Sequence, residues 1–91
     1  VFGSFNEPHD PTVAAIDSQS LRAAIANIIT GHNVDAVFIS CTSVRIAVDV
    51  AAIETELGIP VTSSNHALAW HCLRLAGIDD EQPELGRLFS L

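Results

Sequence analysis

A cysteine stands where a buried strand is expected to give way to a helix. Cys41 follows the apolar run at residues 36–39, and we expect a second helix to begin near Val44. The partial positive charge and unpaired N–H groups at a helix N-terminus favour a thiolate and can hold a carboxylate or an oxyanion. Cys41 is therefore a candidate catalytic thiol, with the hydroxyls of Thr42 and Ser43 beside it. From its position alone, it can equally be a small buried hydrophobic residue.

A single cation follows this cysteine. Arg45 is expected in the first turn of the helix, where a positive charge opposes the helix dipole. A compensating anion, such as a substrate carboxylate held by both arms of the guanidinium, would explain the position. The alternative is a surface ion pair with Asp49, one turn further along.

A second polar cluster follows the short apolar segment at residues 59–62. Ser63, Ser64 and Asn65 are ordinary helix caps, but three in a row exceed what one cap requires. We interpret them either as caps or as the second wall of an anion pocket. His66 comes next and can act as a proton carrier, although a histidine at this position is more often solvated.

The remaining cysteine and histidines indicate no further chemistry. Cys72 has the helical spacing of Leu68 and Leu75, which predicts a core position and an inert thiol. A catalytic Cys41 should then alkylate much faster than Cys72. The histidines and cysteines lack metal-ligand spacing, so we expect no zinc site, and no glycine-rich phosphate loop is present.

The elements that would position these residues alternate along the chain. Residues 1–5 read as the tail of a strand, and residues 6–11 read as a loop. We then expect a helix from Asp17 or Ser18 to Gly31, a strand at 34–40, a helix from 44 to 58, a strand at 59–62 and a helix at 66–76. This order predicts an α/β fold, a parallel sheet flanked by helices. The two polar clusters lie at the carboxyl ends of strands, where sites of such sheets form.

Composition narrows the class of protein. Eleven acidic residues against four arginines, with no lysine, give a net charge of −7, so we expect neither nucleic acid nor an anionic membrane as a partner. No apolar run approaches the roughly 18 residues that span a bilayer. Two cysteines without a signal peptide indicate a cytoplasmic protein. Ninety-one residues form one domain at most, and without a starting methionine we expect a piece of a longer polypeptide. Residues 79–91 form an acidic tail with an apolar strip suited to docking.

Three stretches together resemble the second half of the aspartate/glutamate/hydantoin racemase superfamily. They are Phe38-Ile39-Ser40-Cys41-Thr42-Ser43-Val44-Arg45, Glu54-Thr55-Glu56-Leu57-Gly58-Ile59-Pro60-Val61 and Ser63-Ser64-Asn65. The similarity continues through residues 2–6, 67–71, 73–78 and 86–89 and so spans nearly the whole chain. The nearest likeness is to ectoine-utilisation proteins, with the maleate cis-trans isomerases and arylmalonate decarboxylases as related branches.

The resemblance implies one lobe of a two-lobed enzyme without a cofactor. Family members place a cysteine in each lobe on opposite sides of the substrate; Cys41 matches the second-lobe cysteine, and its counterpart would precede Val1. In racemases, one thiolate removes the α-proton while the other thiol returns a proton to the far face. In maleate isomerases the matching cysteine adds to a double bond, and in decarboxylases it protonates an enediolate. The segment after Cys41 departs from the maleate isomerase pattern.

These observations lead to one expected function with stated alternatives. We expect a cofactor-independent racemase or isomerase that acts on a small carboxylic acid or amino-acid derivative through Cys41, as a homo-oligomer. The expected substrate-binding residues are Thr42, Ser43, Arg45, Ser63, Ser64 and Asn65. The alternatives are maleate isomerase-like or arylmalonate decarboxylase-like chemistry, and a non-catalytic ligand-binding α/β domain. Residues 1–91 would supply only the second half-site and have no turnover alone.

Overall fold

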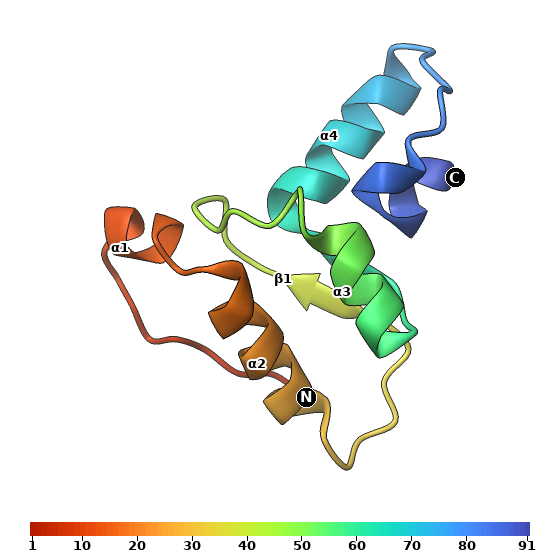
Figure 1. Ribbon diagram of the computed structural model, residues 1–91. Helices are drawn as coiled ribbons and strands as arrows, with labels where there is room; N and C mark the ends of the chain where they lie inside the picture. Colours follow the sequence, from red (N-terminus) through yellow and green to blue (C-terminus); the bar gives the residue numbers. More distant parts are fainter.

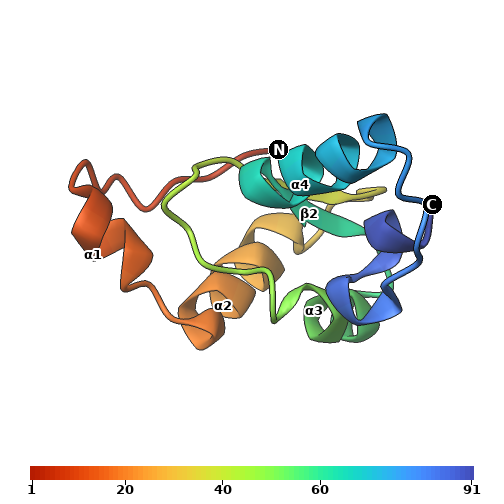
Figure 2. The same cartoon turned by 90° about the horizontal axis from the view of Figure 1, so that it is seen from above.

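The computed structural model describes all 91 residues and places a small parallel sheet between helices (Figure 1). Figure 2 shows α4 on one side of the strands, with α2 and α3 on the other. In chain order the elements are α1 (Asp10–Ala14), α2 (Ser18–Ile29), β1 (Val37–Ile39), α3 (Val50–Leu57), β2 (Val61–Ser63), α4 (Ser64–Leu75) and two 3₁₀ turns, Pro83–Leu85 and Arg87–Ser90. The predicted α/β class is confirmed. None of the helices is long and apolar enough to cross a membrane.

The sheet contains only β1 and β2, which pair in parallel with Val37 opposite Val61 and Ile39 opposite Ser63. Val37 and Ile39 pack against the core beneath the sheet. Phe38 points to the opposite face and is 60% exposed, so the expectation of a strand covered on both faces is wrong. The strand is also shorter than expected, and residues 1–5 form no strand.

The first long helix forms as its sequence predicts. The Asp17 carboxylate accepts a hydrogen bond from the Ser20 backbone nitrogen at 2.7 Å, which caps α2. This hydrogen bond lowers the pKa of Asp17 below its ordinary value of 3.8. Leu21 and Ile25 from the predicted stripe are buried against the sheet. Strong local signals, a cap and a periodic apolar face, therefore determine α2.

The second long helix begins later than the sequence predicts. Helix α3 starts at Val50 rather than near Val44. In the preceding segment, the buried Val44 and Ile46 alternate with the exposed Arg45 and Ala47. Burial with a period of two is typical of extended chain, and it competes with the helical stripe formed by Ile46, Val50, Ile53 and Leu57. The stripe still packs as expected, because Ile46 and Val50 join the same core cluster.

A short helix, α1, replaces part of the expected loop. It begins at Asp10, and Pro11 lies in its first turn. The backbone N–H that proline lacks would have no hydrogen-bond partner within the helix at this position. Val13 is its one buried residue and joins the core cluster.

The acidic tail folds back onto the domain through its apolar residues, as its sequence suggested. Phe89 is 3% exposed and packs edge-on against the ring of His66, with 4.7 Å between ring centroids. The buried Glu54 carboxylate accepts hydrogen bonds from the backbone nitrogens of Val61 and Arg87, both at 2.9 Å. One side chain of α3 thus connects the start of β2 to the tail, a contact that the sequence did not indicate.

Candidate active site

Cys41 lies two residues after the end of β1, so the predicted position at the carboxyl end of a strand is confirmed. Its backbone φ is +130°, a conformation that residues other than glycine rarely adopt. Such strain costs about 1–3 kcal/mol and persists only where the surrounding structure enforces it, frequently at functional sites.

The helix that starts beside Cys41 is not the one that follows it in the chain. The expected proximity to the start of α3 is wrong, because that helix begins at Val50, nine residues later. Instead, the Cys41 backbone nitrogen donates a hydrogen bond to Ser64 Oγ at 3.3 Å, and Ser64 is the first residue of α4. The N-terminus of α4 therefore contacts the backbone of Cys41, in place of the expected contact with α3.

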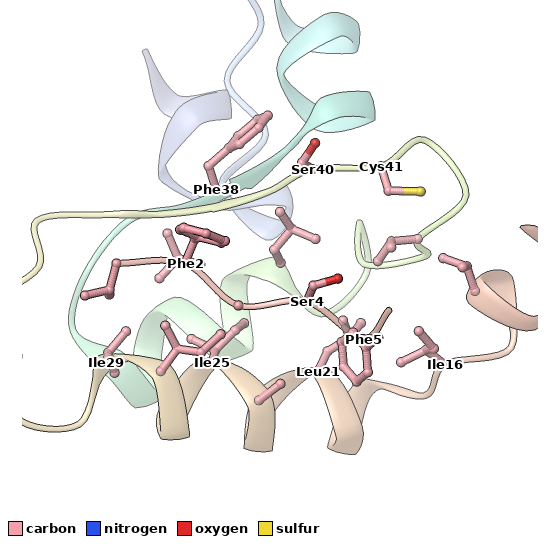
Figure 3. A pocket seen from close by; sticks show the side chains of 18 of the residues that line it. Phe2, Ser4, Phe5, Ile16, Leu21, Ile25, Ile29, Phe38, Ser40 and Cys41 are labelled. Atoms are coloured by element: carbon pink, nitrogen blue, oxygen red, sulfur yellow. The ribbon is translucent and has the colours of Figure 1, made fainter. Parts of the chain in front are cut away.

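An apolar cavity of about 690 Å³ adjoins Cys41. It lies between residues 1–7, α2 and β1, and 17 of its 22 lining residues are hydrophobic. In Figure 3 the Cys41 side chain lies on the side of the chain that faces the N-terminal segment, while Phe38 and Ser40 extend to the opposite side. The thiol is half-buried and packs against the core. Cys41 thus presents its sulfur to a mainly apolar space.

A second cavity of about 1010 Å³ collects most of the other predicted site residues; half of its 18 lining residues are hydrophobic, and we call it the polar cavity for the polar side chains gathered there. Its lining includes Thr42, Ser43, Arg45, Ser63, Asn65 and the unpredicted Asp10 and Gln82. Cys41 and Ser64 do not line it. Val44 lines both cavities, so the segment from Cys41 to Arg45 is the wall between them. The structure therefore brings the polar residues together and turns the thiol to the other side of that wall.

Arg45 is exposed and has neither an ion pair nor a side-chain hydrogen bond. The alternative of a pair with Asp49 is wrong, because Asp49 lies 3.7 Å from Arg22 instead. The helix-dipole argument for Arg45 also does not apply, since this residue precedes α3. What remains is an unpaired guanidinium on the wall of the polar cavity.

Each residue of the second polar cluster has an internal hydrogen bond. Ser63 Oγ caps α4 by accepting from the His66 backbone nitrogen at 3.2 Å. Ser64 Oγ accepts from Cys41, and Asn65 Nδ2 donates to the Thr42 carbonyl oxygen at 2.7 Å. The cluster therefore holds backbone groups in place, in addition to lining the polar cavity through Ser63 and Asn65.

His66 is 4% exposed, so the expectation that it is solvated is wrong. Its Nε2 is hydrogen-bonded to the carbonyl oxygen of Leu85. Because a carbonyl only accepts, Nε2 carries a proton and donates it in this hydrogen bond. His66 also lines the polar cavity. The sequence offered no signal for its burial, because its partner lies 19 residues away in the tail.

Cys72 is exposed, together with Leu68 and Leu75 at 62% and 75%. The predicted core position is therefore wrong. Helix α4 extends past the narrow sheet (Figure 1), and His66 is its one buried residue. Accessibility alone now favours modification of Cys72 over Cys41. No group of three or more His, Cys, Asp or Glu side chains is placed to hold a metal ion.

A family model described as arylmalonate decarboxylase matches residues 9–89. The chain belongs to the arylmalonate decarboxylase family. The match includes Cys41, the polar cavity wall and the tail, and it confirms the predicted branch of the racemase superfamily. No curated protein and no solved structure matches the chain.

Proposed function

We propose that this member of the arylmalonate decarboxylase family is part of a cofactor-independent enzyme that acts on a small carboxylic acid through the thiol of Cys41. The observation that carries the proposal is the strained backbone of Cys41 at the end of β1, with its side chain directed to a cavity. Strain of this kind is retained where the surroundings impose it, and active sites are a frequent place for it.

The thiol can exchange a proton with the α-carbon of a substrate. In racemisation, the thiolate removes the α-proton and leaves an enediolate, and an acid on the opposite face returns a proton to that carbon. In decarboxylation, the C–C bond to the departing carboxylate breaks, its electron pair forms the enediolate, and the thiol donates its proton to the carbon. Both reactions need a sulfur that can reach the substrate, and the half-buried Cys41 at the edge of a cavity supports this role.

Arg45 is our candidate for binding the substrate carboxylate. It is unpaired and lies four residues from Cys41, on the wall between the two cavities. The hydroxyls of Thr42 and Ser43 line the same cavity. A guanidinium with two neighbouring hydroxyls can hold a carboxylate on the side of the wall that faces the polar cavity. Ser63 and Asn65 complete the polar lining from the start of α4.

Decarboxylation is a second candidate, supported by the apolar cavity beside Cys41. A carboxylate that enters apolar surroundings without hydrogen bonds loses its solvation, which favours its departure as neutral carbon dioxide. The family description agrees with this chemistry. Racemisation and isomerisation place no such requirement on the cavity.

We further propose that these 91 residues are one lobe of a two-lobed, homo-oligomeric cytoplasmic enzyme, in keeping with two free cysteines. Chemistry on both faces of a carbon needs groups from two sides in a closed pocket. This chain places Cys41 on one side only. We therefore expect turnover by the parent polypeptide and none by this chain alone.

The test is turnover of aspartate, hydantoins, maleate and arylmalonates by the parent polypeptide and by Cys41→Ser and Cys72→Ser. Cys41→Ser should lose at least about 100-fold in kcat, the usual contribution of a general acid or base. Cys72→Ser is the matched control and should retain full activity. Reaction in deuterium oxide distinguishes the chemistries, because decarboxylation releases carbon dioxide and a racemase exchanges the α-proton of its substrate. Full activity of Cys41→Ser overturns the proposal, and binding without turnover by the parent favours a ligand-binding domain.

A further inference from the structure

The first turn of α4 is hydrogen-bonded to both ends of the dipeptide that contains the candidate thiol. Ser64 Oγ accepts from the Cys41 backbone nitrogen at 3.3 Å. Asn65 Nδ2 donates to the Thr42 carbonyl oxygen at 2.7 Å. The first N–H and the last carbonyl of Cys41–Thr42 are therefore both fixed by two consecutive residues of one helix.

We infer that Ser64 and Asn65 are positioning residues, a clamp that holds Cys41 at its strained φ and keeps its thiol directed toward the apolar cavity. The inference rests on the proposed role of Cys41 and gives the second polar cluster a task other than substrate contact. Ser64 supports this reading, because it lines neither cavity although its hydroxyl is engaged.

The strain at Cys41 requires such a holding force. At φ +130° the backbone lies outside the regions that side-chain-bearing residues prefer, and release would let the residue rotate to a negative φ. The Cα–Cβ bond would turn with the backbone, and the sulfur would move relative to the cavity. The two hydrogen bonds to the backbone of Cys41–Thr42 contribute a free energy of the same order as the cost of this strain.

A plain helix-capping role does not account for these contacts. Ser63 already caps α4 by accepting from the His66 nitrogen. The hydrogen bonds of Ser64 and Asn65 instead leave the helix and reach a segment 23 residues earlier in the chain. Their effect should therefore appear in the behaviour of Cys41 rather than in the stability of α4.

The experiment measures alkylation of Cys41 by iodoacetamide from pH 6 to 10, in the 91-residue chain with Cys72→Ser. We expect Ser64→Ala and Asn65→Ala to change the rate by about tenfold, in line with the sensitivity of reactions to misplacement of about 1 Å. Ser64→Thr keeps a hydroxyl and should restore the rate to within about twofold. Asn27→Ala, at an exposed site on α2, is the matched control and should have no effect.

Asn65→Asp separates the clamp from helix stability. An ionised aspartate cannot donate to the Thr42 carbonyl, yet an acid in the first turn of α4 favours the helix dipole. The clamp predicts a changed alkylation rate in this variant at unchanged or raised Tm. An alkylation profile equal to that of the parent chain in Asn65→Ala, Asn65→Asp and Ser64→Ala overturns the inference.

Turnover by the parent polypeptide separates this inference from the proposed function. The clamp predicts a lower kcat in Ser64→Ala at a KM within about twofold, because Ser64 lines neither cavity and the carboxylate site at Arg45 is untouched. If Cys41→Ser loses turnover while the Ser64 and Asn65 variants keep kcat and alkylation rate, the clamp is rejected and the function stands. If Cys41→Ser keeps turnover, the function itself is rejected.

Discussion

The carboxylate of Glu54 accepts a hydrogen bond from the backbone nitrogen of Arg87, 33 residues further along the chain. Its other oxygen accepts from Val61 at the start of β2. Glu54 is 4% exposed, so both hydrogen bonds are shielded from water in the folded chain. The wall of the polar cavity that Leu85 and Phe89 supply therefore depends on this side chain.

Glu54→Ala should lower the free energy of unfolding by about 3 kcal/mol, because two buried N–H groups lose a charged acceptor. Glu56→Ala, two residues along the same helix, is the matched control. Glu56 is exposed and pairs with Arg22, so its loss should cost within about 1 kcal/mol. Urea unfolding of the three proteins measures both values. Equal costs for the two variants would contradict the role of Glu54.

Gly86→Ala should destabilise the chain more than Gly58→Ala does. Both glycines have positive φ, +99° and +73°, so an alanine at either is strained by about 1–2 kcal/mol. A Cβ at Gly86 would also lie 2.5 Å from Val50 Cγ1, whereas a Cβ at Gly58 meets nothing within 4 Å. The clash should add about 1–3 kcal/mol, measured as the difference between the two variants. A smaller loss for Gly86→Ala would mean that the tail does not pack this closely on α3.

Asp17→Asn should remove a pH-dependent part of the stability. The Ser20 backbone hydrogen bond lowers the pKa of Asp17 below 3.8, so the folded state binds this proton more weakly than the unfolded state does. The resulting stability is fully present above about pH 3.8 and is lost as pH falls through the lower folded value. Asparagine caps without a charge, so the parent should be more stable at pH 7, and the two proteins should converge as pH falls through the lowered pKa of Asp17. Urea unfolding across this range tests it, and a difference that is independent of pH would contradict it.

Local signals predicted part of this fold, and contacts between distant segments decided the rest. Helix α2 follows from the Asp17 cap and the stripe through Leu21 and Ile25, which need no partner to be recognised. The start of α3 was misplaced because Ile46 fits both a helical stripe and an extended alternation with Val44. Only the tertiary packing selects between them.

The candidate site also combines features that the local sequence predicts with features that depend on distant segments. The position of Cys41 after β1 could be read from the apolar run before it. The hydrogen bond between Cys41 and Ser64 could not be predicted, because no local sequence pattern indicates a contact between residues 23 positions apart. The burial of His66 depends on the tail in the same manner, and the exposure of Cys72 depends on the width of the sheet beneath α4.

Arg45→Ala should raise KM for a carboxylate substrate by about 10- to 100-fold in the parent polypeptide, the cost of one charge-assisted hydrogen-bonding group. Its free energy of unfolding should not change, because Arg45 is exposed and unpaired. Arg22→Ala is the control with the opposite outcome, since Arg22 pairs with Asp49 and Glu56 away from the cavity. It should lower stability slightly and leave KM unchanged. Steady-state kinetics and urea unfolding of both variants distinguish a binding residue from a surface charge.

The two cysteines should differ in which reagents they accept rather than in overall speed. Cys72 is exposed on α4, so iodoacetate and N-phenylmaleimide should both reach it from water. Cys41 is half-buried beside a cavity in which 17 of 22 lining residues are hydrophobic, and a carboxylate entering such a space loses solvation. The preference for N-phenylmaleimide over iodoacetate should therefore be about tenfold larger at Cys41 than at Cys72, which corresponds to about 1.4 kcal/mol of transfer free energy.

Mass spectrometry of the single-cysteine variants Cys72→Ser and Cys41→Ser at pH 7 gives both ratios, and taking a ratio at each site cancels its intrinsic thiol reactivity. A similar preference at the two sites would mean that the Cys41 sulfur faces solvent, and the apolar cavity would then have no part in its chemistry.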